Sequence, residues 1–143
     1  MPIRLATVVS GLICAEGLRW REGRIWFSDL DTCKVQSARE DGSDLRVEAI
    51  VSHQPRGFDW LPDGRLLIVS LTDRALLRRE RNGELVLHAD LSARIDGGLG
   101  DVVVDKRGRA YISAFGGNAS AGEMLQRGMI HRVDPNGAVT PVA

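Results

Sequence analysis

Gly57-Phe-Asp-Trp-Leu-Pro-Asp-Gly-Arg-Leu-Leu-Ile-Val-Ser70 is the stretch of sequence that decides the fold. Two apolar runs flank Pro62-Asp63-Gly64, an order typical of a tight turn, because proline fixes φ and glycine accepts a positive φ. The run from Leu66 to Val69 contains no polar residue, which indicates a strand buried on both faces. The stretch therefore predicts a β-hairpin whose second strand lies inside packed sheets.

The same unit occurs twice more in the chain. Its turn glycines, each followed by an arginine and an apolar strand, recur after 41 and then 44 residues, at Gly23, Gly64 and Gly108. A second turn follows each hairpin, at Asp41-Gly42, Asn82-Gly83 and Asn136-Gly137. Two turns and two further apolar runs make four strands in each unit, and four-stranded repeats of ~40–45 residues are typical of propeller blades. The alternative is an ordinary meandering β-sandwich, but three copies in the same phase favour the propeller.

We therefore predict an all-β fold, a β-propeller of three four-stranded blades: blade 1 over residues 16–51, blade 2 over 57–89 and blade 3 over 100–142. Residues 3–9 form another short apolar stretch, placed before blade 1 as the outermost strands are placed before blades 2 and 3. We predict that they are the closing strand of a further blade, whose other strands are missing. On this interpretation residues 1–143 form one partial domain.

Composition excludes several classes of partner. Lys+Arg and Asp+Glu number 19 each, so the formal net charge is zero, and we expect neither nucleic acid nor a membrane surface as a partner. No apolar stretch is long enough for a signal peptide or a membrane span. The two cysteines, Cys14 and Cys33, do not make a disulfide framework, so free thiols and a cytoplasmic location are predicted.

Four motifs in this order resemble the family of senescence marker protein-30, gluconolactonase and the luciferin-regenerating enzyme. They are Ala15-Glu16-Gly17, residues 60–70, Asp101-Val-Val-Val-Asp105 with the following Gly-Arg-Ala-Tyr111, and Ala114-Phe-Gly116. The family's members are six-bladed propellers. Because six blades of ~45 residues need about 270 residues, the resemblance implies that this chain is the N-terminal half of such a protein.

The resemblance also implies a divalent metal in the central channel, which polarises the carbonyl of a small-molecule lactone. Its ligands are oxygens, which suit calcium, although zinc is an alternative. Glu16 matches the family's glutamate ligand; a solvated glutamate at a strand end is the other interpretation. The remaining ligands have no counterpart here, so the metal belongs to the full-length protein, and this chain alone is not expected to bind it tightly.

Two further residues are candidates for the site. Asp101 matches the family aspartate and is assigned a catalytic role, with hydrogen bonding to backbone amides at the strand start as the alternative. The family has asparagines where this chain has Gly100 and Ala114, which implies altered substrate recognition. Arg56, which is not a family match, is predicted to face the channel and to bind an anionic substrate; a surface arginine is the alternative.

Two functions follow as hypotheses. The first is the N-terminal part of a metal-dependent sugar-lactone hydrolase of the gluconolactonase type, in which the half-length chain is poorly active by itself. The second is a non-catalytic half-propeller that binds or assembles, with two copies pairing into six blades. Blades 1 and 3 each lack a neighbour, so we expect residues 25–27 and 111–112 to leave apolar surface exposed, and the chain to self-associate.

Overall fold

The computed structural model describes residues 1–117, 122 and 126–142. Blade 1 consists of β1 (Ala15–Arg21), β2 (Arg24–Asp29), β3 (Lys34–Arg39) and β4 (Arg46–Ile50). Blade 2 consists of β5 (Pro55–Trp60), β6 (Leu66–Ser70), β7 (Ala75–Arg79) and β8 (Leu85–Asp90). Blade 3 consists of β9 (Leu99–Val104), β10 (Ala110–Gly116), β11 (Gln126–Val133) and β12 (Val139–Pro141). Across these residues no helix has the length and apolarity that a membrane crossing needs.

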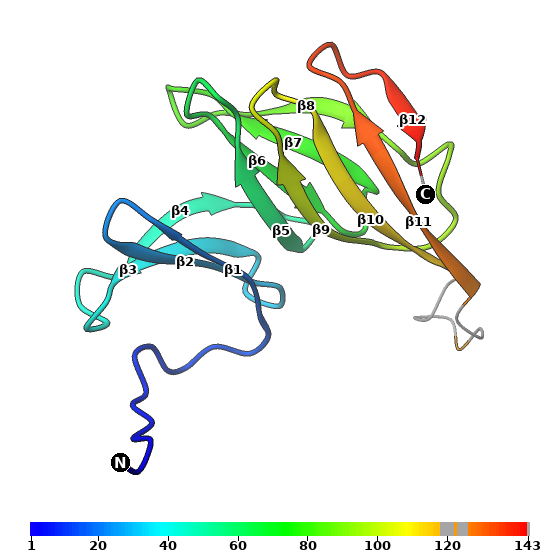
Figure 1. Cartoon of the computed structure of the whole chain (residues 1–143). Helices are drawn as coiled ribbons and strands as arrows, with labels where there is room; N and C mark the ends of the chain where they lie inside the picture. Colours follow the sequence, from blue (N-terminus) through cyan, green and yellow to red (C-terminus); the bar gives the residue numbers. More distant parts are fainter. Residues whose placement is uncertain (118–121, 123–125, 143) are drawn as a thin grey trace.

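Each blade is an antiparallel sheet in which consecutive strands are neighbours, and the three sheets follow one another along an arc (Figure 1). The first strands β1, β5 and β9 contact one another in that order, so they form the inner side of the arc. The prediction of three four-stranded β-propeller blades is therefore confirmed. The hairpin turns lie where the glycines predict them.

The turns form for the predicted reason. Gly23, Gly64 and Gly108 have φ values of 73°, 86° and 77°, in the left-handed region that favours glycine. In the central hairpin the Asp63 carboxylate accepts a hydrogen bond from the backbone N–H of Arg65 (3.0 Å), which holds the turn in place.

Blades 1 and 2 meet through a small cluster of apolar residues. Phe58, at the inner edge of blade 2, is fully buried against Val35 and Val51 of blade 1. Trp26 of blade 1 and Trp60 of blade 2 contact each other edge to face, with ring centroids 5.2 Å apart. The Ser28 hydroxyl, also in blade 1, donates a hydrogen bond to the carbonyl of Arg56 (2.7 Å). This interface therefore combines aromatic packing with a polar contact.

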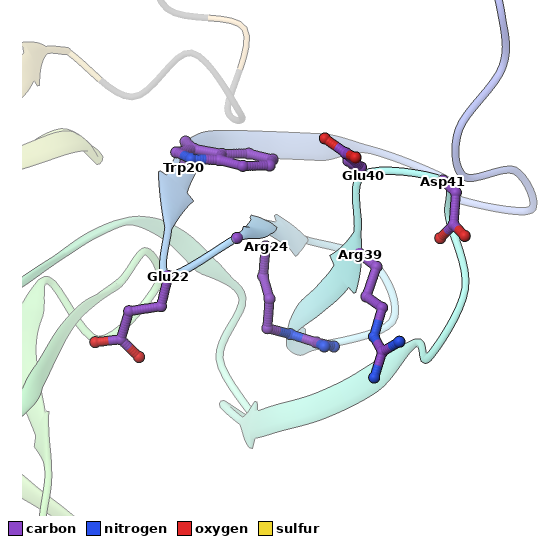
Figure 2. A pocket seen from close by; sticks show the side chains of 7 residues that line it. Trp20, Glu22, Arg24, Arg39, Glu40 and Asp41 are labelled. Atoms are coloured by element: carbon purple, nitrogen blue, oxygen red, sulfur yellow. The ribbon is translucent and has the colours of Figure 1, made fainter.

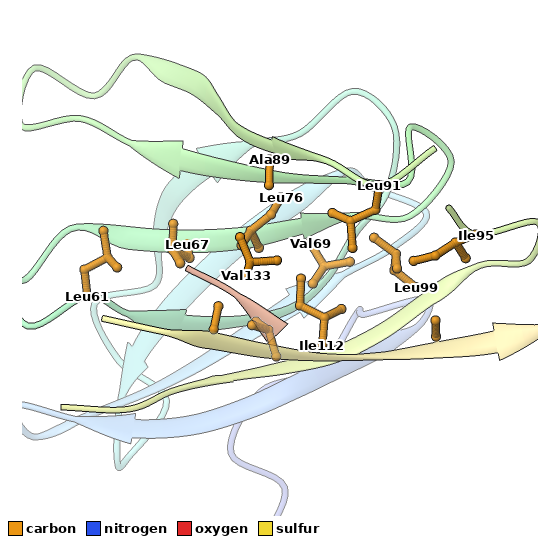
Figure 3. Close-up of a cluster of buried hydrophobic side chains, with 13 residues drawn as sticks. Leu61, Leu67, Val69, Leu76, Ala89, Leu91, Ile95, Leu99, Ile112 and Val133 are labelled. Atoms are coloured by element: carbon orange, nitrogen blue, oxygen red, sulfur yellow. The ribbon is translucent and has the colours of Figure 1, made fainter. Parts of the chain in front are cut away.

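Blades 2 and 3 meet through a larger and mainly aliphatic cluster, shown in Figure 3. Leu67, Val69 and Leu76 from blade 2 are fully buried against blade 3, where Leu99 and Ile112 are also fully buried. Alternate residues of β6 serve the two neighbours, since Leu66 and Ile68 belong to the cluster shared with blade 1. The uninterrupted apolar run of β6 is thus explained by a strand that is buried on both faces.

The expected exposure of residues 25–27 and 111–112 holds only in part, because Ile25, Trp26 and Tyr111 are partly exposed whereas Phe27 and Ile112 are buried. Phe27 is only 2% exposed and Ile112 is fully buried, because Ile112 faces blade 2 rather than solvent. Trp26 likewise packs against blade 2. The most exposed apolar residues in the strands of blade 1 are Leu18 (66%) and Trp20 (60%) on the innermost strand β1, and Ile50 (65%) and Val47 (51%) on the outermost strand β4. The exposed apolar surface of blade 1 therefore lies on its innermost and outermost strands, β1 and β4, rather than on β2 as predicted.

Residues 3–9 form no strand in the structure, and residues 1–7 are exposed (Figure 1). Their role as a closing strand needs partner strands that this chain does not supply, so it stays a prediction. Val8 nevertheless lies beside blade 1, since a Cβ added to Gly42 would come 2.0 Å from the Val8 carbonyl oxygen. In blade 3, Gly137 has the same relation to the carbonyl of His88 in the preceding blade's outer strand (2.8 Å).

Candidate functional site

The three residues predicted for the site lie at one end of the inner strands. Glu16 is the second residue of β1, Arg56 the second of β5 and Asp101 the third of β9. Glu16 Oε1 lies 3.4 Å from Arg56 Nη2, and Asp101 lies against Gly57, the residue after Arg56. The structure therefore brings Glu16 and Arg56 into direct contact, and it places Asp101 beside the backbone of the same strand.

Glycines allow the inner strands to approach so closely. A Cβ added to Gly17 would lie 2.9 Å from the Arg56 carbonyl oxygen, and one added to Gly57 would lie 2.1 Å from Asp101 Oδ1. Neither separation is tolerable for a real side chain, so the sequence needs glycine at both positions. The glycines that open the inner strands are thus part of what assembles the site.

Asp101 is held by an arginine that the sequence did not suggest. Arg19 Nη2 donates a hydrogen bond to Asp101 Oδ1 (2.6 Å) and another to the Val102 carbonyl (3.1 Å), so it spans from blade 1 to blade 3. The Arg19 guanidinium passes over the ring of Phe58 in blade 2, 5.9 Å from its centroid. Asp101 also accepts a bond from the Val102 N–H (2.8 Å). The Asp101 carboxylate thus has a charged partner, Arg19, and also makes the hydrogen bond to a backbone amide that the alternative interpretation predicted.

Arg56 has partners on both sides. Its contact with Glu16, at 3.4 Å, is longer than the 2.7–2.9 Å of a strong charge-assisted hydrogen bond. On the other side its guanidinium lies over the ring of Phe115, 4.9 Å from the centroid. The side chains of Glu16 and Arg56 are 40% and 25% exposed, so Glu16 is open to solvent and Arg56 is largely packed.

A buried carboxylate fixes the entry to β1. Asp29 is 1% exposed and accepts hydrogen bonds from the backbone N–H groups of Cys14 (2.8 Å) and Ile13 (3.3 Å) and from the Thr32 hydroxyl (3.0 Å). Burial acts to raise the pKa of Asp29, but these hydrogen bonds and the nearby Lys34 outweigh it and lower the pKa. The ionised Asp29 thereby anchors the residues that lead into Glu16.

The described residues do not by themselves fit a metal ion. No group of three or more His, Cys, Asp or Glu side chains comes together among them. Glu16 supplies one suitable oxygen, but the guanidinium of Arg56 already contacts it. A divalent ion needs several such ligands, so the others would have to come from outside the described residues. Cys14 and Cys33 are free thiols, as the sequence predicts.

The environment of Gly100 explains one departure from the family pattern. A Cβ at Gly100 would lie 2.4 Å from the Ser113 hydroxyl oxygen, which accepts a hydrogen bond from the Asp101 N–H (3.0 Å). An asparagine at this position would therefore require Ser113 to move. Ala114 is buried against blade 2, so a larger polar side chain there would also need rearrangement.

A hollow of about 490 Å³ lies at the end of blade 1 that is opposite to Glu16 (Figure 2). Its walls are the β1–β2 and β3–β4 turns, with Trp20, Arg24 and Arg39 among the lining side chains. Acidic residues of the same turns, including Glu22 and Glu40, balance the arginines. None of the three predicted site residues lines this hollow, so the candidate site remains at the start of the inner strands.

Known structures share the fold. A gluconolactonase from Xanthomonas campestris superposes with a TM-score of 0.68 at 22% identity, covering 90% of this chain and 47% of that one. Regucalcin from Agrobacterium tumefaciens, a calcium-binding protein, gives a TM-score of 0.71 at 21% identity over 92% of this chain and 43% of its own. A streptogramin B lyase gives 0.65 at 15%, covering 96% and 42% respectively. The chain thus spans about half the length of these proteins, and the likeness establishes the fold.

A search of curated proteins found no match. The family model of the SMP-30/gluconolactonase/LRE-like region, in contrast, matches residues 14–143, which is nearly the whole chain and includes all three blades. The resemblance inferred from the four sequence motifs is therefore confirmed, and the chain belongs to the SMP-30/gluconolactonase/LRE-like family.

Proposed function

We propose that this chain is the N-terminal part of a metal-dependent sugar-lactone hydrolase of the gluconolactonase type, acting in the cytoplasm. The observation that carries the proposal is the position of Glu16, which is partly exposed at the start of the innermost strand of blade 1, at the same end as Arg56 and Asp101. Family membership and the similarity to a gluconolactonase support the reaction class. A small-molecule lactone is the proposed substrate.

The residues take the following proposed roles. Glu16 supplies one oxygen ligand for calcium or zinc, and the bound metal would supply a Lewis acid for the lactone carbonyl. Asp101 is the proposed catalytic carboxylate, and Arg19 is its positioning residue, because their contact of 2.6 Å fixes where the carboxylate lies. Arg56, beside Glu16, is the proposed substrate-binding residue.

The test is Glu16→Gln in a protein that carries all six blades. Loss of one ligand charge should weaken calcium or zinc affinity in calorimetry and lower lactone hydrolysis together. Glu40→Gln is the matched control, because Glu40 is exposed and lies on the β3–β4 turn, at the other end of blade 1. Unchanged metal affinity in the Glu16 variant would mean that Glu16 is no ligand.

A second candidate function is a half-propeller that assembles with another copy. The observation in its favour is a difference between equivalent residues of the inner strands. Phe58 is fully buried in blade 2, whereas Leu18, which follows the corresponding glycine in blade 1, is 66% exposed. Light scattering on the purified chain tests this candidate: Leu18→Arg should convert a dimer to a monomer. A wild-type chain that is monomeric at all concentrations would exclude it.

A further inference from the structure

A cleft of about 460 Å³ lies between blades 2 and 3, next to Arg56. Two arginines line it, Arg56 and Arg74, together with the aromatic ring of Phe115 and the polar side chains of Gln54, Thr72 and Asp96. The volume is in the range of sites that hold small molecules. Its lining comes from blades 2 and 3 and the loops joining them, so the cleft can be studied on this chain.

Among the residues that the structure describes, the partners of Arg56 hold its position but use only part of its hydrogen-bonding capacity. Packing on Phe115, 4.9 Å from guanidinium carbon to ring centroid, holds the plane of the guanidinium. Its ion pair with Glu16 is a single contact of 3.4 Å. A guanidinium offers five N–H donors in a rigid fork, so a single long contact leaves most of its donor capacity for a ligand.

Arg74 adds a second guanidinium on the other wall. Its Nη1 donates a hydrogen bond to the Ile95 carbonyl (2.8 Å), which ties the arginine to the loop that carries Asp96 and Gly97. That loop is tightly packed, since a Cβ added to Gly97 would lie 2.0 Å from the Phe115 carbonyl oxygen. The two arginines therefore lie on firm supports, which lowers the entropic cost of binding a ligand between them.

The charges and surfaces of the cleft select one class of ligand. Arg56 and Arg74 outnumber Asp96 among the charged lining residues, and Glu16, outside the lining, makes only one contact with Arg56, at 3.4 Å. Guanidinium groups match the oxygens of carboxylates and phosphates. Phe115 offers a flat apolar face, while Gln54 and Thr72 offer hydrogen bonds for hydroxyl groups. A hydroxylated molecule with an anionic group meets all of these features.

We propose that this cleft binds the carboxylate or phosphate group of a hydroxylated small molecule. In the proposed function, the lactone would carry this anionic group in addition to its ring ester. The identification of the lactone rests on the proposed function, but the anion site does not, because the cleft is formed without Glu16 or a metal.

Calorimetry on this chain, in EDTA, tests the anion site with three probes. D-glucarate carries two carboxylates, 6-phosphogluconate carries a phosphate, and sorbitol is neutral with similar hydroxyl groups. We expect at least one anion to bind with millimolar or better affinity and sorbitol not to bind. The stronger of the two anions identifies the favoured group, and added salt should weaken its binding.

Variants localise the binding. Arg56→Gln and Arg74→Gln should each weaken the better anion about tenfold or more, because each removes charge-assisted hydrogen bonds. Arg46→Gln is the control, since Arg46 is an exposed arginine of β4 that pairs with Asp44 (2.6 Å). If Arg74→Gln disturbs folding in circular dichroism, Phe115→Leu replaces it and should weaken binding by removing the support of Arg56.

Three results would overturn the proposal: no anion binding up to tens of millimolar, equal binding of sorbitol, or unchanged affinity in Arg56→Gln. The outcomes separate from those of the proposed function. Anion binding by a family protein without lactonase activity would reject the hydrolase and keep the anion site. If the chain binds no anion and the protein is a metal-dependent hydrolase that acts equally on neutral and anionic lactones, the anion site would be rejected and the hydrolase kept.

Discussion

The contact between blades 1 and 2 differs in kind from the contact between blades 2 and 3. The first contains six buried apolar residues, and Trp26 and Trp60 pack beside them at partial exposure. The second contains thirteen buried apolar residues, all of them aliphatic, including Leu76, Leu99 and Ile112. The first relies in addition on polar contacts, such as the hydrogen bond from Ser28 to the Arg56 carbonyl.

Because the two contacts bury different numbers of apolar residues, we expect the blades to differ in local stability. Apolar burial supplies most of the free energy of folding and scales with the area removed from water. Blades 2 and 3 therefore form the stable unit, and blade 1 is attached to it less firmly. Regions with few buried apolar contacts open first, so we expect the strands of blade 1 to exchange their amide protons before those of β6 and β10.

The largest effect should come from Leu76→Ala, at the centre of the contact between blades 2 and 3. Leu76 is fully buried, and removing a buried leucine side chain costs about 2–5 kcal/mol of unfolding free energy. Urea denaturation followed by circular dichroism measures the loss. Leu87→Ala is the control, because Leu87 is 61% exposed and should change stability by less than about 0.5 kcal/mol. Similar losses in both variants would contradict the assignment of Leu76 to a buried, stabilising contact.

A smaller effect is expected from Gly57→Ala, which acts on the inner edge of the arc. The new methyl group would lie 2.1 Å from Asp101 Oδ1 and 2.5 Å from Asp101 Cα, so β5 and β9 must separate. Overpacking of this kind costs about 1–3 kcal/mol, and it should also disrupt the contact of Arg19 with Asp101. Thermal unfolding is the measurement.

The control for that variant is Gly98→Ala. Its added methyl group would lie 3.0 Å from the end of the Leu71 side chain, which can move aside, and 3.7 Å from the Phe115 ring, an ordinary contact. A Gly57→Ala protein as stable as the Gly98→Ala protein would contradict the close approach of the inner strands.

Acidification should weaken the contact between blades 2 and 3 through His131. This residue is 4% exposed, its Nδ1 is buried without a hydrogen-bond partner, and burial followed by the charge of Arg94 lowers its pKa. The unfolded chain then takes up the proton more readily, so stability is fully present above the unfolded pKa of about 6.5 and is lost as the pH falls below it. The melting temperature at pH 5 should be lower than at pH 7.5.

His131→Gln should reduce this pH dependence. His53→Gln is the matched control, because the side chain of His53 is 60% exposed. Burial also lowers the pKa of His88, on the outer strand of blade 2, so part of the dependence should remain in the His131 variant. An unchanged pH profile in that variant would show that His131 is not the source.

The smallest effect is expected from Ser28→Ala, which tests the polar part of the contact between blades 1 and 2. It removes the hydroxyl that donates to the Arg56 carbonyl at 2.7 Å, at a cost of about 1 kcal/mol. Hydrogen exchange should rise in blade 1 and stay constant in β10. Ser52→Ala, at an exposed serine, serves as the control. Equal acceleration throughout the chain would indicate global unfolding rather than detachment of blade 1.

The sequence predicts what depends on neighbouring residues along the chain. Gly23, Gly64 and Gly108 mark turns by their own backbone preference, and an apolar run such as residues 66–69 marks a strand buried on both faces. For this reason the blades and their number could be predicted. The orientation of β2 could not, because alternation alone does not tell whether Trp26 or Phe27 faces blade 2.

The site was predictable only as a set of positions. Glu16, Arg56 and Asp101 could each be placed at a strand start, and the structure puts them at the same end. The pairing of Arg19 with Asp101 depends on the approach of residues 82 positions apart, which no local pattern encodes. The glycines that open the inner strands carried the one available signal, since glycine inside a strand often marks a close backbone approach.

The bond from Arg19 to Asp101 has a geometric consequence. It joins the first and third blades across the second, so it acts as a chord that fixes the curvature of the arc. A ring closes only if the turns between its segments add up to a full circle, and an error in one angle displaces every segment that follows it. One salt bridge near the axis would thereby help to determine whether the two ends of a ring meet.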